Sequence, residues 1–165
     1  MSRVLYYRKE GDSAVTGFAA LGWADAAGIG YRARVAPVEI PEDIAERIRG
    51  LCLALPEVTV RIDESRIEAR STAWSFEVRR RSFCLLVARE GSAGKPVPVL
   101  VLRARPEERE ALLSLGHPFH ASRAGRDRIV VVLTGDTDWE EIRELVTESY
   151  RILAPKKLTA MLGKR

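Results

Sequence analysis

Apolar residues recur with two different periods along this chain of 165 residues, and the order of those periods restricts the fold. At residues 41–55, and again near the C-terminus, the apolar spacing is three or four residues, which is typical of amphipathic helices. Between them, apolar and polar residues alternate in short runs separated by turn residues, which is typical of β-hairpins. Helices that flank a series of hairpins in the sequence predict an α+β fold. We expect a two-layer sandwich, in which an antiparallel sheet has helices packed on one face. No strand–helix–strand alternation supports a parallel nucleotide-binding sheet.

Two segments before the last helix have helical signals. Residues 41–55 carry an apolar stripe, Pro41 suits the first helical position, and Pro56 ends the segment. Residues 106–115 form a shorter helix that ends at Gly116. The stripe of the longer helix consists of Ile44, Ile48, Leu51 and Leu55.

The helix near the C-terminus has the clearest pattern. Thr137 and Glu140 match a capping box at its start, and Pro155 stops it. One face is predicted to pack on the sheet, while the other holds carboxylates in solvent. The packing face consists of Trp139, Ile142, Leu145, Val146, Ser149, Ile152 and Leu153, and the acidic face of Asp138, Glu140, Glu141, Glu144 and Glu148.

Alternating apolar residues predict a β-hairpin over residues 74–87, with three consecutive arginines at its tip. The alternating residues are Trp74, Phe76 and Val78 before the arginines Arg79, Arg80 and Arg81, and Phe83, Leu85 and Val87 after them. The other strands are expected at 58–62, 66–70, 97–101, 118–122 and 129–133, with a turn at 63–65 between the first two.

Residues 1–40 lack a sustained period, apart from a short strand predicted at Val4–Tyr7. We expect them to be an N-terminal extension, either flexible or simply upstream of the functional unit at residues 41–165. The sequence has no run of 18 apolar residues, so a membrane span is not expected. Glu10 and Asp12 disfavour a signal peptide, and we therefore expect a cytoplasmic protein.

Metal and disulfide chemistry find little support in the sequence. The two cysteines, Cys52 and Cys84, cannot build a disulfide framework or a four-cysteine zinc site, and their places in apolar patterns predict buried thiols. His117 and His120 form an H-x-x-H pattern, but Pro118 between them disfavours a shared helix face. We interpret both as loop histidines and expect no metal site and no cofactor.

Catalytic motifs are equally sparse. The sequence has no G-x-S-x-G or S-x-x-K motif. Residues 91–95, GSAGK, lack the leading glycine and the Ser or Thr after the lysine that a phosphate loop requires. Carboxylates on the long helices are expected to face solvent rather than a cleft. We therefore expect no catalytic residues and no enzymatic activity.

Charge is segregated along the sequence although the formal net charge is +4. Residues 79–105 hold seven basic side chains and one acidic one, residues 136–148 hold six acidic and one basic, and residues 151–165 hold five basic and no acidic ones. Phosphate groups favour basic hairpin tips, because neutralising them releases counterions. The alternative is that these arginines serve solubility.

Five segments carry a resemblance to a known family: LALPEV (53–58), SFEVR (75–79), RPEE (105–108), DWEEI (138–142) and SYRILAPKKL (149–158). With this order and spacing, residues 41–162 resemble the MmcQ/YjbR family, which adopts a CyaY-like, or frataxin-like, α+β fold. The chain departs from the family pattern at two places. Arg80 and Arg81 stand where it usually has Gly-Lys, so the tip keeps its charge but loses its tight glycine turn. Arg128 and Ile129 stand where it commonly has a tryptophan.

The resemblance also implies candidate functions. Members of the family have been proposed to bind DNA through a double-wing arrangement of hairpins, which agrees with the arginine-tipped hairpin. The frataxin-like fold raises iron binding as a rival, because frataxins use an acidic ridge on the first helix and the neighbouring strand. Glu42, Asp43 and Glu46 are a thin version of that ridge, so DNA is favoured over iron. A shared fold does not by itself transfer function.

The leading hypothesis is a non-enzymatic, cytoplasmic DNA-binding domain that contacts the phosphate backbone. One alternative is a protein-interaction module that uses the acidic helix face or the N-terminal extension, and another is a small-molecule-binding protein. The candidate nucleic-acid-binding residues are Arg79, Arg80, Arg81, Lys95, Arg103, Arg126, Arg128, Lys156 and Lys157.

Overall fold

The computed structural model describes residues 4–8, 39–64, 72–90 and 95–162. The strands are β1 (Val4–Arg8), β2 (Val58–Glu64), β3 (Thr72–Val78), β4 (Arg81–Glu90), β5 (Pro96–Arg103), β6 (Phe119–Ala121) and β7 (Arg128–Val132). The helices are α1 (Glu42–Leu53), α2 (Pro106–Leu115), α3 (Trp139–Leu153) and α4 (Lys156–Thr159).

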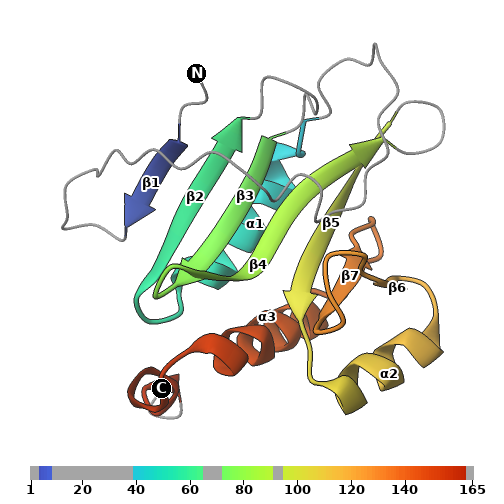
Figure 1. Cartoon of the computed structure of the whole chain (residues 1–165). Helices are drawn as coiled ribbons and strands as arrows, with labels where there is room; N and C mark the ends of the chain where they lie inside the picture. The colour runs from blue at the N-terminus through green and yellow to red at the C-terminus, as the bar shows by residue number, and fades with distance from the viewer. Residues whose placement is uncertain (1–3, 9–38, 65–71, 91–94, 163–165) are drawn as a thin grey trace.

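The described strands form one seven-stranded sheet in the order β1-β2-β3-β4-β5-β7-β6, and all neighbouring pairs are antiparallel. Helices α1 and α3 pack on one face of this sheet, and α2 lies beside β6 (Figure 1). The predicted α+β sandwich, with helices on one face of an antiparallel sheet, is therefore confirmed. The CyaY-like assignment stays a prediction.

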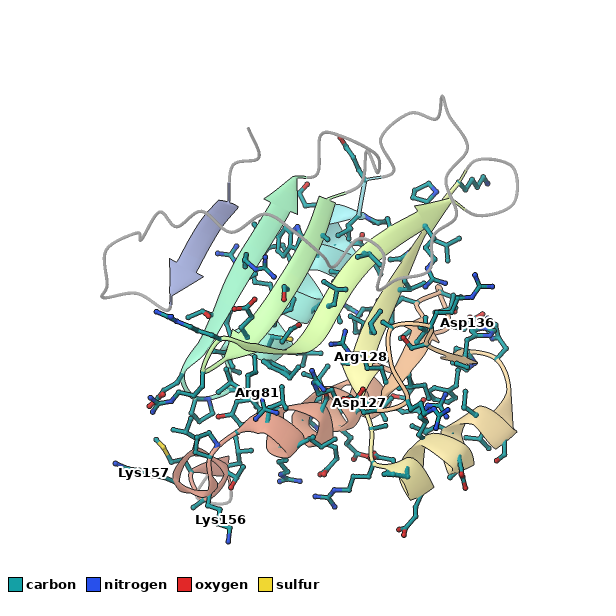
Figure 2. The ribbon with its side chains drawn as sticks, viewed as in Figure 1. Arg81, Asp127, Arg128, Asp136, Lys156 and Lys157 are labelled. Carbon is teal, nitrogen blue, oxygen red and sulfur yellow. The ribbon has the colours of Figure 1, made fainter. Side chains whose placement is uncertain are left out.

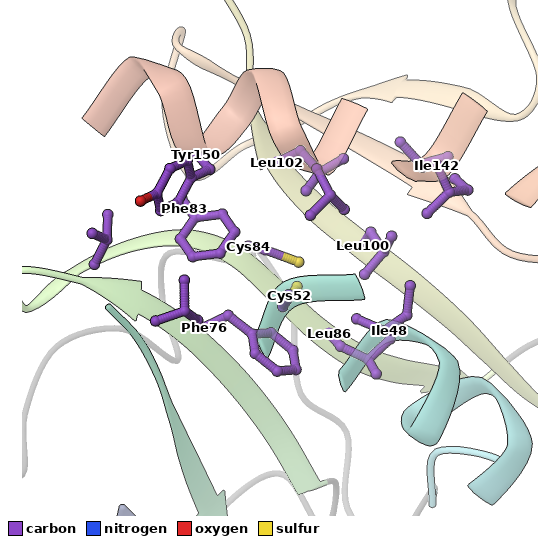
Figure 3. Packing of buried hydrophobic residues seen from close by; sticks show 14 of the residues in the cluster. Ile48, Cys52, Phe76, Phe83, Cys84, Leu86, Leu100, Leu102, Ile142 and Tyr150 are labelled. Carbon is purple, nitrogen blue, oxygen red and sulfur yellow. The ribbon is translucent and has the colours of Figure 1, made fainter. Parts of the chain in front are cut away.

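The hydrophobic core lies between the sheet and helices α1 and α3 (Figure 3). Ile48 of α1, Phe76 of β3, Leu86 of β4, Leu100 of β5 and Tyr150 of α3 all have 0% exposed surface. Burying an aliphatic or phenylalanine side chain of this size stabilises a fold by about 1.5–3 kcal/mol. The core thus joins the first helix, the central strands and the last helix, which confirms their predicted packing.

Helix α1 buries one residue of its predicted stripe completely. Ile48 is joined by Ala45 and Cys52, because these three residues lie on the same helical face. Cys52 and Cys84 are both free and buried, as expected, and their sulfur atoms face one another in Figure 3. The helix begins after Pro41, which is its N-cap rather than its first helical residue.

The N-terminus of α3 differs from the predicted capping box. Asp138 is the N-cap, and its carboxylate accepts hydrogen bonds from the amides of Glu140 at 2.9 Å and Glu141 at 3.3 Å. The hydroxyl of Thr137 instead accepts a hydrogen bond from the amide of Thr134 at 2.8 Å. The helix therefore starts one residue later than the pairing of Thr137 with Glu140 predicted.

Strand β4 contains a β-bulge that the alternating pattern did not predict. The register with β3 shifts so that Glu77 lies opposite Ser82, and Phe83 is left as the extra residue. Phe83 therefore packs with the core under the helices, whereas Leu85 and Val87 belong to the opposite face of the sheet. The three residues do not share a face, although their spacing predicts that they do.

A second, smaller apolar cluster lies on the sheet face opposite α1 and α3. Its buried members, exposed by 2–5%, are Ala73, Val87, Val99, Val101 and Val130. Strand β5 contributes to both clusters, because Leu100 and Leu102 point toward the helices while Val99 and Val101 point away. Burial on both faces explains the continuous apolar run of this strand.

Several expectations concern the chain ends and connections. The strand predicted at Val4–Tyr7 is present as β1 and pairs with β2, so it extends the sheet of the predicted domain. Strand β2 runs to Glu64 and includes two residues of the turn expected at 63–65. The rest of the N-terminal extension up to residue 38, the strand expected at 66–70 and residues 91–94 lie outside the described residues.

Two remaining elements complete the chain. Helix α2 has the predicted bounds and ends at Gly116, which has φ of 74°. A short helix, α4, follows Pro155, where the sequence predicted only the end of α3. Within the described ranges, no helix is long and apolar enough to cross a membrane.

Candidate nucleic-acid interface

The turn between β3 and β4 consists of two arginines in a rare backbone conformation. Arg79 and Arg80 have φ of 51° and 62°, and Val78 pairs with Arg81 on either side of them. Such a two-residue hairpin turn, left-handed at both central positions, normally takes Asn-Gly or Gly-Gly. The tight turn is therefore retained without glycine, which corrects the expectation drawn from the family pattern. A left-handed conformation costs about 1–2 kcal/mol per non-glycine residue.

A third left-handed residue lies against this turn. Glu57 has φ of 53°, and its carboxylate pairs with the guanidinium of Arg79 at 2.8 Å. The preceding carbonyl oxygen, of Pro56, accepts a hydrogen bond from the hydroxyl of Tyr150 at 2.9 Å. Burial raises the pKa of Tyr150 to about 12, and the charge of Glu57 adds to the shift. Within the described residues, the non-glycine positive φ values are confined to Glu57, Arg79 and Arg80.

Arg103, the last residue of β5, is fixed by three contacts. Its amide donates a hydrogen bond to the hydroxyl of Ser149 at 2.8 Å. Its Nε donates to the carbonyl oxygen of Ser82 at 3.0 Å, and its Nη1 pairs with the carboxylate of Asp127. With 18% of its side chain exposed, Arg103 is the more deeply buried member of that ion pair.

Arg128, the first residue of β7, lies directly opposite Arg103 in the register of the sheet. Like charges at such positions destabilise a sheet. Burial is the main cause that lowers the pKa of Arg103; Arg128 and Arg81 lower it further, while Asp127 opposes them. The backbone carbonyl of Arg128 accepts a hydrogen bond from Nε of Arg109 at 3.1 Å, which links α2 to this site. Arginines from β4 and β7 thus lie near Arg103 of β5, while Asp127 is the carboxylate that pairs with it.

We call this region the arginine end of the sheet, and Figure 2 shows three of its residues, Arg81, Asp127 and Arg128. The candidate nucleic-acid-binding residues that lie in it are Arg79, Arg80, Arg81, Arg103, Arg126 and Arg128. Glu57 neutralises Arg79 and Asp127 neutralises Arg103. Among the described residues, no carboxylate forms an ion pair with the other four, Arg80, Arg81, Arg126 and Arg128.

The three candidate lysines occupy different places. Lys95 precedes β5 at the opposite end of the ten-residue strand β4. At roughly 3.3 Å per residue, it lies about 30 Å from Arg81, so it does not join the arginine end. Lys156 and Lys157 are exposed on α4, and in Figure 2 they project away from Arg81.

The residues considered for metal binding are dispersed. His117 and His120 are exposed, with ring centroids 6.1 Å apart, and His120 lies in β6 rather than in a loop. On α1, Glu46 pairs with Arg49 at 3.2 Å. In the part of the chain that the structure describes, no group of three or more His, Cys, Asp or Glu side chains is arranged to hold a metal ion.

The fold and this site define the class of protein: an α+β sandwich whose strand ends gather arginines at one end of the sheet. The family model for YjbR matches residues 53–152, which is more than half of the chain and includes the arginine turn and all of α3 except its last residue. The chain therefore belongs to the YjbR family. No curated protein and no solved structure was found to match it.

Two carboxylates that were not predicted from the sequence, Glu57 and Asp127, decide which arginines are neutralised. Glu57 follows Pro56 just before β2, and Asp127 lies between Arg126 and Arg128 just before β7. Their positions next to strand starts were a usable signal, because an acidic residue there can reach the neighbouring strand. The pairing of strands that makes the contact specific was not visible in the sequence.

Proposed function

We propose that this YjbR-family protein is a non-enzymatic DNA-binding domain that contacts the phosphate backbone through its arginine end. The observation that carries the proposal is the strained turn, in which Arg79 and Arg80 hold positions that glycine would occupy at lower cost. Strained residues concentrate at ligand clamps, where function retains them. Arginine supplies permanent charge and a fork of donors that matches phosphate oxygens.

The arginines of this region have two proposed roles: some contact phosphate directly, and others position the turn and the strand end. Arg80, Arg81, Arg126 and Arg128 are the proposed phosphate contacts, because their charges are not neutralised by a described carboxylate. Arg79 and Arg103 are held in ion pairs and order the turn and the end of β5. Lys156 and Lys157 extend the footprint on a longer duplex, whereas Lys95 is left out of it because of its distance.

The spacing of these arginines suits a duplex. Arg81, Arg103 and Arg128 begin or end adjacent strands, so their Cα atoms lie roughly 5–12 Å apart. That range is comparable to the major groove, which is about 12 Å wide and admits a two-stranded β-ribbon. Contacts of this kind fix position on the duplex without reading its sequence.

Fluorescence anisotropy with a labelled duplex tests this function. Arg81→Ala is expected to lower the affinity by roughly threefold to tenfold at low salt. Lys95→Ala is the matched control, because it removes one exposed positive charge at the other end of β4. Equal losses in both variants would mean that net charge alone attracts DNA, and no measurable binding of wild-type protein would refute the function.

A protein-interaction module is the second candidate, and the acidic face of α3 favours it. Glu140 and Glu148 on that face pair with arginines one helical turn away, namely Arg143 and Arg151. Glu141 and Glu144 are exposed and have no described ion pair. A stoichiometric partner captured by wild-type protein but not by Glu141→Gln/Glu144→Gln, without duplex binding, would support this function over the first.

A further inference from the structure

Asp127 places a negative charge in the middle of the arginine end. Its carboxylate pairs with Arg103, yet the two side chains are exposed to very different degrees, 56% for Asp127 and 18% for Arg103. Arg103 is also held through its Nε by the carbonyl oxygen of Ser82 at 3.0 Å. The carboxylate can therefore turn toward water at small cost, while the guanidinium stays where it is.

The loop before β7 is shaped to present this carboxylate. The carbonyl oxygen of Asp127 accepts a hydrogen bond from the amide of Ala104 at 3.0 Å, which fixes the backbone next to the end of β5. Gly125 has φ of 151°, and a Cβ there would lie 2.7 Å from Oδ1 of Asp127. The loop thus depends on glycine both for its conformation and for the space that the Asp127 side chain fills.

Arg103, the partner of the Asp127 carboxylate, lies opposite another positively charged residue, Arg128. Arg103 and Arg128 lie directly opposite each other on β5 and β7, an arrangement that an anion between them would relieve. Carboxylates and phosphates use the same guanidinium donors. An anion that takes the Nη1 donor of Arg103 must therefore replace Asp127.

We infer that Asp127 is a built-in competitor of phosphate: it occupies Arg103 in the free protein and is displaced when a phosphate group binds between Arg103 and Arg128. This inference rests on the proposed function for the identity of the ligand. It assigns Arg103 a second role, because the residue that positions β5 in the free protein becomes a phosphate contact in the complex. Only molecules with a released Asp127 accept the ligand at this point, so the internal ion pair lowers the apparent affinity.

The test uses the full chain, with inorganic phosphate and then a labelled duplex as ligands at constant ionic strength. Asp127→Asn removes the competing charge and is expected to tighten the binding of both ligands by about threefold to fivefold. Asp136→Asn is the matched control, because Asp136 is exposed, has no described ion pair and lies away from Arg81 in Figure 2. It removes the same charge and is expected to change both affinities by less than twofold.

Nuclear magnetic resonance on wild-type protein gives an independent readout. Phosphate is expected to shift the side-chain carboxyl carbon of Asp127 and the Nε–H signal of Arg103 along one saturation curve. An unmoved Asp127 signal, or equal tightening in the two Asn variants, would overturn the inference. Because phosphate is tested apart from the duplex, tighter phosphate binding without duplex binding would refute the DNA proposal and leave the competitor intact. Duplex binding that is unaffected by Asp127→Asn would refute the competitor role of Asp127 and leave the DNA proposal intact.

Discussion

The hydroxyl of Ser149, on α3, accepts a hydrogen bond from the backbone amide of Arg103, on β5, at 2.8 Å. The same hydroxyl donates to the carbonyl oxygen of Phe83, the extra residue of the bulge in β4. A bulge leaves backbone groups without ladder partners, and buried groups of this kind need a partner. One side chain of the last helix therefore supplies both missing bonds and fixes the strand end that carries Arg103.

Ser149→Ala is predicted to destabilise the fold by about 2–3 kcal/mol, because it leaves one buried donor and one buried acceptor unpaired. Thr147→Ala on the same helix is the control, since its hydroxyl bonds only to the carbonyl oxygen of Arg143 within α3 among the described contacts. That change is predicted to cost less than about 1 kcal/mol. Chemical denaturation of the two variants measures the difference, and equal losses would contradict the bridging role.

Arg80→Gly is predicted to stabilise the protein by about 1 kcal/mol, because glycine adopts φ of 62° without steric cost. The same change is predicted to weaken duplex binding, since it removes a proposed phosphate contact. Arg81→Gly separates the two effects: Arg81 begins β4, so glycine there costs about 0.5–1 kcal/mol while it also removes a charge. Thermal denaturation measures the change in stability, and fluorescence anisotropy measures the change in duplex affinity. An Arg80→Gly variant that binds DNA as well as wild type would contradict the proposal that Arg80 contacts phosphate.

Tyr150 predicts a pH dependence of stability at the alkaline end. Its pKa is raised from about 10 to about 12, mainly by burial, so the neutral phenol is favoured in the folded state. The unfolded chain releases this proton first, and the stabilisation that is complete below pH 10 is lost as the pH rises toward 12. Tyr150→Phe loses the hydrogen bond to the carbonyl oxygen of Pro56, so the variant is predicted to be less stable at neutral pH. Because it also lacks the ionisable phenol, its stability is predicted to fall less than that of wild type between pH 10 and 12. Parallel slopes for the two proteins would contradict the assignment.

The thiols are predicted to be inert in the folded protein. Burial, followed by the hydrogen bond with Cys84, raises the pKa of Cys52 well above its ordinary value, and both side chains are buried. A thiolate is the reactive form. A disulfide reagent at pH 8 should therefore modify neither cysteine until denaturant is added, and then both. Fast modification of native protein would show that α1 does not pack on β4 as described.

The fold was largely predictable because periodicity reports burial. The alternation around Arg79–Arg81 predicts the β3–β4 hairpin, and the apolar stripe of α3 predicts its packing face. The bulge at Phe83 was not predictable, because apolar residues on both sides of it conceal the change of face. Strand β5 hides its orientation for the same reason, since it is apolar on both faces.

The positive charge of the site could be predicted from the sequence, but the ion pairs that neutralise part of it could not. The run of arginines at 79–81 directed attention to the correct end of the sheet. Which guanidinium groups are neutralised depends on Glu57 and Asp127, which reach them across neighbouring strands. Lys95 is close to this run in the sequence and far from it in space, because β4 separates the two turns.

The salt dependence of duplex binding tests the central claim most directly. The logarithm of the binding constant, plotted against the logarithm of salt concentration, falls with a slope of about 0.9 per phosphate contact. Arg81→Ala is predicted to reduce the magnitude of this slope by about 0.9, the value of one phosphate contact, and Lys95→Ala is predicted to leave the slope unchanged. Identical slopes for wild type and Arg81→Ala would contradict the claim that the arginine end binds the backbone.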